Sequence, residues 1–235
     1  MVKKIFAYSY IYLIMLFLYL PILYLIVFSF TDSQLLGQWS GFSGVLYVNL
    51  FKNEEIMKAL GNTLILACLA ALVSTVIGTL GAIGVHYCKK GFKTIIENIN
   101  QIPVVNAEIV IAMSLTVMFV FLGNNFFGGE SIFSFWTLLI GHCCLAIPFV
   151  YLNVKPKLLQ MDPAMYEAAM DLGCSPTKAL HKVVLPQILP GIFSGLLLSF
   201  TLSLDDFIVT AFTRGSGLLS GTSQIETLST LVQAK

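Results

Sequence analysis

Residues 167–173 read Glu-Ala-Ala-Met-Asp-Leu-Gly, and after nine further residues positions 183–186 read Val-Val-Leu-Pro. This stretch lies in a polar segment between two long apolar runs, so the needs of a bilayer do not account for it. Asp162 and Pro163 predict the start of a helix, because aspartate caps a first turn and proline suits the first helical position. We expect that helix to end at Gly173, which can adopt a left-handed conformation.

A second short helix is predicted directly afterwards. Ser175 and Pro176 repeat the cap-and-proline signal, and we expect the helix that they open to break before Pro186. The small side chains of Ala168 and Ala169 would let another surface approach closely. The sequence therefore predicts a docking element of two short helices at an angle, the alternative being an amphipathic loop that packs on its own chain.

The spacing of this segment resembles the cytoplasmic coupling loop of the permease subunits of ABC importers. Val183 stands where that family usually has isoleucine, a change that conserves shape and apolarity. The resemblance implies that the loop at 155–186 docks a separate ATPase. The residues that carry the motif, and to which the resemblance assigns this coupling role, are Glu167, Ala168, Ala169, Gly173, Leu185 and Pro186.

The composition is that of a membrane protein. The chain is 57% hydrophobic and 11% charged, against about 25% charged residues in average soluble domains. Five runs contain no Asp, Glu, Lys or Arg, and each exceeds the roughly 20 residues that a helix needs to cross a bilayer. The runs are 5–31, 59–85, 109–129, 131–154 and 183–204. We therefore expect an all-α, multi-pass integral membrane protein with five visible spans, and the resemblance implies the helical bundle of type I ABC importer permeases.

The distribution of lysines predicts the orientation. One set of loops carries most of them, namely Lys3, Lys4, Lys89, Lys90, Lys93, Lys155, Lys157, Lys178 and Lys182. The alternate loops carry only Lys52, Lys58 and Arg214. Because positive charge is enriched on the cytoplasmic side, the N-terminus and the coupling loop are expected to be cytoplasmic, in a bacterial inner membrane.

The number of spans differs from that of the family. Five spans starting in the cytoplasm would leave the C-terminus outside, whereas the family normally has a sixth span. The stretch 225–232 is too short and polar to be that span and is expected to form a brief external helix. We expect a single permease domain, residues 1–235, that is truncated at its C-terminus; the alternative is loss of the sixth span.

Three acidic residues mark a possible path for a substrate, because ionisable groups in spans are costly and often functional. Glu108 opens the third span, and Asp205 and Asp206 lie late in the fifth. A stripe of small or polar residues runs along the fifth span, comprising Gly195, Ser199, Ser203, Asp206 and Thr210. Since no lysine or arginine lies in any span, charge favours a cation. The alternative is that the serines and threonines join helices and the acids end the spans.

Residues 198–207, Leu-Ser-Phe-Thr-Leu-Ser-Leu-Asp-Asp-Phe, resemble the C-type permeases of spermidine/putrescine importers. This resemblance implies polyamine transport. The residues that it assigns to the substrate path are Asp205, Asp206, Ser203, Glu108 and Trp39. Trp39 could equally be a tryptophan of the membrane interface.

The chain contains no phosphate-binding loop of the G-x-x-x-x-G-K-[ST] type. We therefore expect a transport subunit that is not an enzyme and has no cofactor or metal of its own, with ATP and magnesium on a partner. The implied partners are an ATPase dimer, a second homologous permease and an external substrate-binding protein, and no nucleic acid. Permeases for thiamine, ferric ion or another cation, a secondary transporter or channel, and a membrane-embedded enzyme remain alternatives.

Overall fold

The computed structural model describes residues 2–33, 37–126, 128, 132–215 and 225–234, with side chains from Tyr8 to Gln233. Over these residues the chain is helical, apart from an isolated antiparallel bridge between Thr31 and Phe42. The elements are α1 (Val2–Phe28), α2 (Val45–Lys52), α3 (Glu54–His86), α4 (Lys90–Val105), α5 (Glu108–Phe126), α6 (Phe135–Gln160), α7 (Pro163–Asp171), α8 (Pro176–Ala179), the π-helical η1 (Leu180–Val184), α9 (Leu185–Asp205), α10 (Ile208–Thr213) and α11 (Leu228–Ala234). The all-α prediction is confirmed.

Within the described residues, five helical segments are long and apolar enough to cross a membrane. They are Tyr8–Phe28, Glu54–His86, Glu108–Phe126, Phe135–Gln160 and Pro176–Asp205. Each contains most of one of the five uncharged runs, so the prediction of five visible spans is confirmed. The chain is a multi-pass membrane protein.

The chain divides into two compact units, residues 1–57 and 58–235. In the first unit, every side chain of α1 from Tyr8 to Val27 is exposed. A helix that is apolar and exposed on all sides suits contact with lipid or with other membrane helices. Beyond α1, the rings of Phe30 and Phe42 stack with centroids 5.4 Å apart, beside the Thr31–Phe42 bridge.

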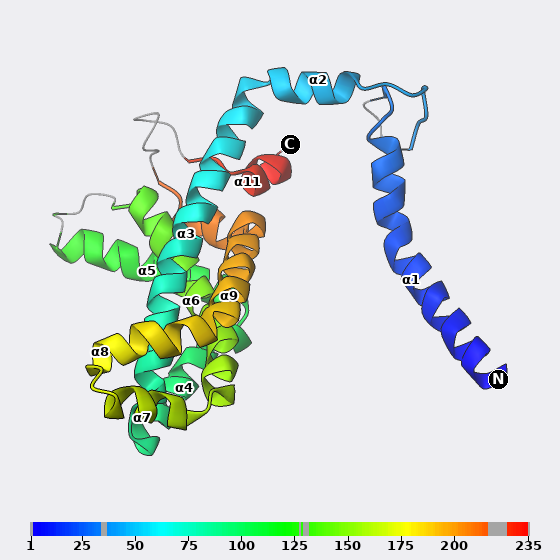
Figure 1. Ribbon diagram of the computed structural model, residues 1–235. Helices are drawn as coiled ribbons and strands as arrows, with labels where there is room; N and C mark the ends of the chain where they lie inside the picture. The colour runs from blue at the N-terminus through cyan, green and yellow to red at the C-terminus, as the bar shows by residue number, and fades with distance from the viewer. Residues whose placement is uncertain (1, 34–36, 127, 129–131, 216–224, 235) are drawn as a thin grey trace. The chain divides into compact units, whose positions relative to one another are not determined.

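The second unit is built around α6. Its most extensive partner is α9, and α3, α4 and α10 also pack against it (Figure 1). Val150 of α6 is fully buried between two glycines, Gly78 of α3 and Gly195 of α9. A Cβ atom added to Gly78 would lie 2.8 Å from Val150 Cβ, and one added to Gly195 would lie 3.2 Å from Val150 Cα. Glycine therefore lets three spans approach one another closely.

The small and polar stripe of the fifth span packs largely inside the chain. The buried residues of α9 are Ile188, Gly191, Gly195, Ser199 and Ser203. The expectation that the stripe continues along one helix to Thr210 is wrong, because α9 ends at Asp205 and Asp206 takes an extended conformation with ψ 116°. Thr210 lies on the separate helix α10, which packs on α5 and α6.

Helix α4 was not anticipated from the sequence. It places the carboxylate of Glu97 2.8 Å from the Lys155 ammonium of α6, and this hydrogen-bonded ion pair lowers the pKa of Glu97 below its ordinary value. An apolar periodicity of three and four residues, at Phe92, Ile95 and Ile99, was the available signal. Lys90, Lys93 and Glu97 interrupt the segment, so it does not stand out as an uncharged run.

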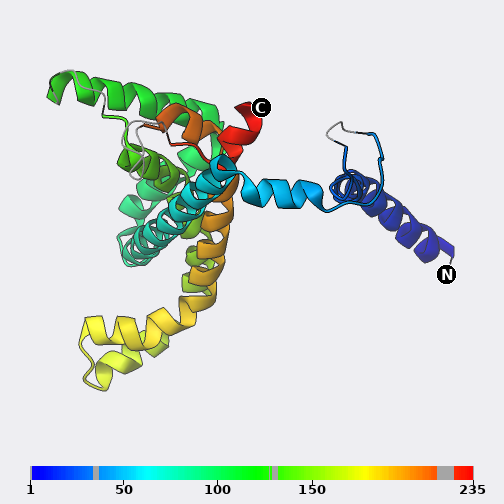
Figure 2. The ribbon, with the colours of Figure 1, turned by 90° about the horizontal axis from the view of Figure 1, so that it is seen from above.

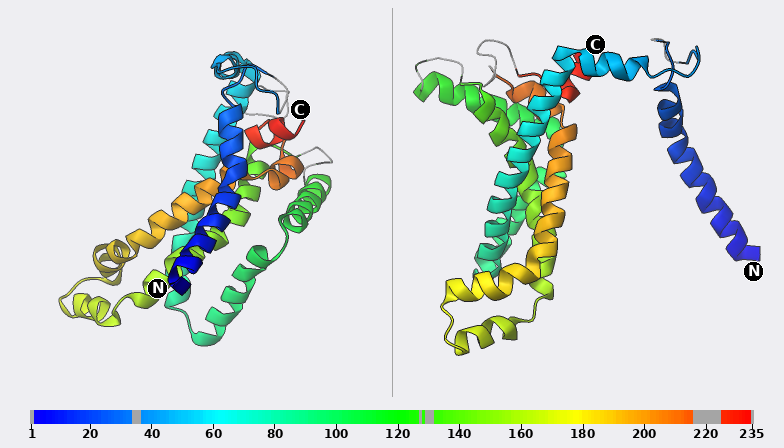
Figure 3. Two further views of the ribbon diagram at one scale, coloured as in Figure 1. Left: turned by 90° about the vertical axis from the view of Figure 1, so that its right-hand side faces the viewer. Right: turned by 45° about the horizontal axis from the view of Figure 1, so that its top comes forward.

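Different helices form the two ends of the second unit. Helices α7 and α8 extend from one end, whereas α10 and α11 lie at the other (Figures 2 and 3). The segment 225–232, expected to be a brief helix, contains most of α11. The predicted coupling loop and the acidic end of the fifth span are therefore separated by the length of α9.

Candidate functional site

The start and the end of the first coupling helix are as predicted. Asp162 caps α7, with its Oδ1 accepting a hydrogen bond from the Ala164 N–H at 3.0 Å. At the other end Gly173 has φ +86°, and the N–H of Cys174 donates to the Ala169 carbonyl at 3.1 Å. This is the left-handed glycine termination that satisfies the last carbonyls of a helix.

The second coupling helix differs from the prediction. It begins at Pro176, but it does not break before Pro186; it continues through the π-helical turn η1 into α9. In that turn the N–H of Leu185 donates to the carbonyl of Leu180, five residues earlier. A wide turn of this kind admits the proline, since the ring otherwise clashes with the carbonyl four residues before it.

The residues predicted to couple to an ATPase are not equally accessible. Glu167, Ala168, Gly173 and Pro186 are exposed, whereas Ala169 is buried and Leu185 is partly buried in the core of the second unit. Ala169 therefore faces its own chain, and Ala168 alone of the two offers a small exposed side chain. Leu172, which sequence reasoning did not select, is 87% exposed.

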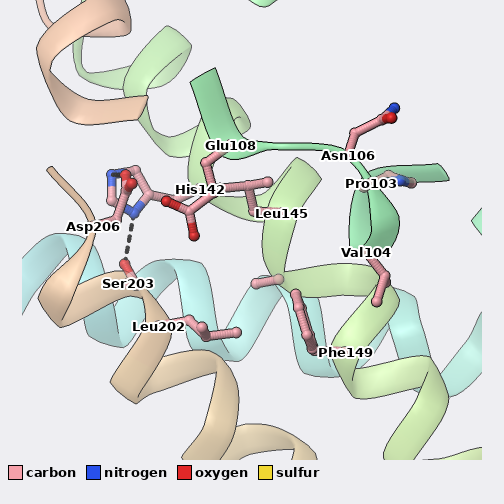
Figure 4. A pocket seen from close by; sticks show the side chains of 11 residues that line it. Pro103, Val104, Asn106, Glu108, His142, Leu145, Phe149, Leu202, Ser203 and Asp206 are labelled. Atoms are coloured by element: carbon pink, nitrogen blue, oxygen red, sulfur yellow. Dashed lines mark hydrogen bonds and ion pairs between the residues drawn. The ribbon is translucent and has the colours of Figure 1, made fainter. Parts of the chain in front are cut away.

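A cavity of about 110 Å³ lies at the junction of α4, α5, α6 and α9 (Figure 4). It contains three of the five residues predicted for the substrate path, which come from separate parts of the sequence. The lining residues are Pro103, Val104, Asn106, Glu108, His142, Leu145, Ala146, Phe149, Leu202, Ser203 and Asp206. The structure thus brings Glu108, Ser203 and Asp206 together.

Asp206 is held at the cavity by the break between α9 and α10. Its Oδ1 accepts a hydrogen bond from the Val209 N–H and its Oδ2 from the Thr210 N–H, both at 3.2 Å. Its backbone carbonyl accepts from the hydroxyls of Thr210 at 3.1 Å and Ser229 at 2.9 Å. The carboxylate consequently has a defined position, because both of its oxygens and its own carbonyl are anchored.

His142 lines the cavity and was missed as a site residue. It is 3% exposed, and its ring contacts Ser203, Thr210 and Asp206. The sequence offered one weak signal, namely a titratable side chain inside an otherwise uncharged run. That signal could not identify the partners of His142, which are 61 to 68 residues away along the chain.

Two predicted path residues are not among the residues that line this cavity. Asp205, the last residue of α9, is exposed and does not line the cavity. The helix ends at Asp205, and of the pair only Asp206, with its extended backbone, lines the cavity. Trp39 belongs to the unit of residues 1–57, where its ring meets that of Phe28 edge-on with centroids 6.0 Å apart. Its role in a substrate path stays a prediction.

The cavity combines negative charge with apolar walls. Glu108 and Asp206 contribute carboxylates, and among the described lining residues there is no lysine or arginine to neutralise them. Leu145, Phe149 and Leu202 supply apolar surface. Such a site suits an organic cation, because ammonium groups pair with carboxylates while methylene groups and an aromatic face provide apolar and cation–π contact.

Comparison with known proteins places the chain among transport permeases. The family described as "Binding-protein-dependent transport system inner membrane component" matches residues 74–233. The spermidine/putrescine transport system permease protein PotC of Escherichia coli K12 is 35% identical over 208 residues, which are 88% of this chain and 74% of that protein. The putrescine transport system permease protein PotI of the same organism is 34% identical, covering 84% of this chain and 70% of that protein.

A solved structure shows the same fold. A bacterial ABC transporter involved in the import of the acidic polysaccharide alginate superimposes with a TM-score of 0.68 over 86% of this chain and 75% of the matched chain. The sequence identity is 19%, so the likeness concerns the fold alone. The prediction of the ABC importer permease architecture is confirmed.

Proposed function

Because the chain belongs to the family of binding-protein-dependent transport system inner membrane components, we propose that it is a transmembrane subunit of an ATP-driven polyamine importer. The observation that carries the proposal is the cavity that joins Glu108 and Asp206 without a lysine or arginine among its described lining residues. The names of the relatives, which refer to spermidine and putrescine, support the same class of substrate.

The proposed cargo fits the chemistry of the cavity. A polyamine alternates ammonium groups with short methylene chains. One ammonium would lie between the carboxylates of Glu108 and Asp206, with adjacent methylenes against Leu145 and Phe149. An anionic cargo would meet uncompensated negative charge there, which costs several kcal/mol in a site of low polarity. The site would attract polyamine only briefly, since tight binding would oppose release.

We propose that the energy comes from a separate ATPase, because the chain has no phosphate-binding loop. The exposed residues Glu167, Ala168 and Leu172 at the α7–α8 end would contact that subunit on the cytoplasmic side. ATP would draw the coupling helices of this chain and a homologous second permease together and open the cavity outward. An external binding protein would then deliver the polyamine, and hydrolysis would return the cavity to the inward-facing state.

The test is uptake of labelled spermidine by proteoliposomes that contain this chain in its full-length importer, with ATP inside and the binding protein outside. Asp206→Asn is the critical variant, because asparagine carries no charge but keeps one of the two acceptor oxygens that bond to the N–H groups of Val209 and Thr210. Loss of a hydrogen bond to a charged group costs about 1.5–3 kcal/mol, which corresponds to a fall in uptake of roughly 10- to 150-fold. Asp205→Asn is the matched control and should transport nearly normally, since Asp205 lies outside the cavity.

The outcomes separate the alternatives. ATP-dependent uptake that is lost in Asp206→Asn and kept in Asp205→Asn supports the proposal. A second outcome is that the importer hydrolyses ATP in response to a substrate-loaded binding protein and yet takes up no polyamine. That result would indicate that the substrate is another cation, such as thiamine or ferric ion. Uptake that continues without ATP would instead indicate a secondary transporter or channel.

A further inference from the structure

Buried His142 connects the helices that form the cavity. Its Nδ1 lies 2.9 Å from the hydroxyl of Ser203 on α9, and its Nε2 lies 3.0 Å from the hydroxyl of Thr210 on α10. The same Nε2 is 3.4 Å from Oδ2 of Asp206. Figure 4 shows the imidazole beside both Ser203 and Asp206, at the wall of the cavity. These contacts indicate which ring nitrogen carries hydrogen.

The hydrogen of Thr210 is already committed elsewhere. Its hydroxyl donates to the backbone carbonyl of Asp206 at 3.1 Å, and a hydroxyl has only one hydrogen to give. Toward His142 the Thr210 oxygen must therefore accept, so Nε2 of His142 is the donor. In a neutral imidazole Nδ1 then carries the lone pair and accepts the hydrogen of Ser203.

The direction of this chain of hydrogen bonds determines what Ser203 offers the cavity. With its hydrogen directed at His142, its oxygen presents only lone pairs to a bound molecule. The carboxylates of Glu108 and Asp206 are also acceptors. An ammonium group has only donors, so its N–H groups could bond to all three. A molecule that needed a donor from the protein would find none among these three side chains.

We propose that neutral His142, with hydrogen on Nε2, is a positioning residue that makes Ser203 an acceptor and so completes an ammonium-binding set with Glu108 and Asp206. This inference rests on the proposed function, because the ammonium group belongs to the polyamine. His142 does not touch the cargo through its donor nitrogen; it acts through Ser203 and through the anchored start of α10. If His142 offered no lone pair at Nδ1, the Ser203 hydroxyl could turn its hydrogen into the cavity, where it would point at the N–H groups of the bound ammonium.

Two substitutions at position 142 separate this role from a purely structural one. Asparagine can place its amide oxygen near the position of Nδ1 and keep an acceptor for Ser203. Glutamine can place its amide nitrogen near Nε2 and keep the donor for Thr210, but it offers no group at Nδ1. We therefore expect His142→Gln to transport about tenfold less spermidine per ATP hydrolysed, the loss of one hydrogen bond to a charged group. His142→Asn should retain most of the transport.

A double-mutant cycle tests whether the effect passes through Ser203. Spermidine uptake and ATP hydrolysis are measured together in vesicles with the complete importer, for wild type, His142→Gln, Ser203→Ala and the double variant. If His142 acts by orienting the Ser203 hydroxyl, the double variant should transport as much spermidine as Ser203→Ala alone. Additive losses, or equal losses for the asparagine and glutamine variants, would overturn the proposal. So would a parallel fall in uptake and ATP hydrolysis, because that result indicates a structural role.

The tautomer can be measured independently of the cargo. In the ¹⁵N-histidine-labelled importer at neutral pH, the signals of His142 are those missing from the His142→Asn variant. We expect hydrogen on Nε2 and a lone pair on Nδ1. Hydrogen on Nδ1, or on both nitrogens, would refute the orientation of Ser203 even if polyamine is transported. Conversely, a correct tautomer without any polyamine uptake would contradict the proposed function and leave the hydrogen-bond arrangement intact.

Discussion

Replacing Gly78 with alanine should destabilise the protein, because the new methyl group has no room. Its Cβ would lie 2.8 Å from both Cβ and Cγ1 of Val150 and 3.1 Å from the Ile147 carbonyl oxygen. Val150 cannot withdraw, since the backbone of α9 at Gly195 closes its other side. Overpacking of this kind costs about 1–3 kcal/mol. The better helix propensity of alanine offsets about 1 kcal/mol of that cost, which leaves a net loss of about 0–2 kcal/mol.

Gly84→Ala on the same helix is the matched control. An added Cβ there meets no atom within 4 Å, so only the gain in helix propensity of about 1 kcal/mol remains. The two variants should therefore differ by about 1–3 kcal/mol, or about 2–12 °C in melting temperature at roughly 2–4 °C per kcal/mol. Thermal unfolding of the detergent-purified importer measures this difference. Equal melting temperatures for Gly78→Ala and Gly84→Ala would refute the packing argument.

Three further variants test local features of the second unit. Asp162→Ala should destabilise α7 by about 1 kcal/mol, seen as faster amide hydrogen exchange near Ala164; unchanged exchange would contradict the observed cap. Gly173→Ala should cost about 1–2 kcal/mol, because φ is +86° there, and a melting temperature equal to wild type would argue against that conformation. The Glu97–Lys155 ion pair lowers the pKa of Glu97 in the folded protein below its ordinary value of 4.5. The ion pair therefore stabilises the fold fully above pH 4.5, and this stabilisation is lost as the pH falls through the pKa of Glu97 in the folded protein. Glu97→Gln should thus cost about 1 kcal/mol or less at pH 7, and the difference from wild type should vanish in acid; a gap independent of pH would exclude this origin.

Local features of the fold were predictable from the sequence because their causes are local. The long uncharged runs identify the spans, since transfer of apolar side chains into lipid depends on composition over about 20 residues. Asp162 and Gly173 mark the ends of α7, because capping involves groups within five residues of each other. Pro186 is the instructive exception. The rule that proline interrupts a helix is sound, but the π-helical turn before it absorbs the clash and lets α9 follow without a break.

The sequence by itself thus determined the membrane class, the five visible spans, the coupling motif and the presence of acids without basic partners in the fifth span. Only the tertiary structure decided that Asp206, and not Asp205, reaches the cavity. That choice depends on where α9 ends, and on α10 turning back to bring Thr210 to His142. It also brought together Glu108, His142 and Ser203 from three different helices. Such contacts depend on the rotation and close packing of whole helices, which no short stretch of sequence encodes.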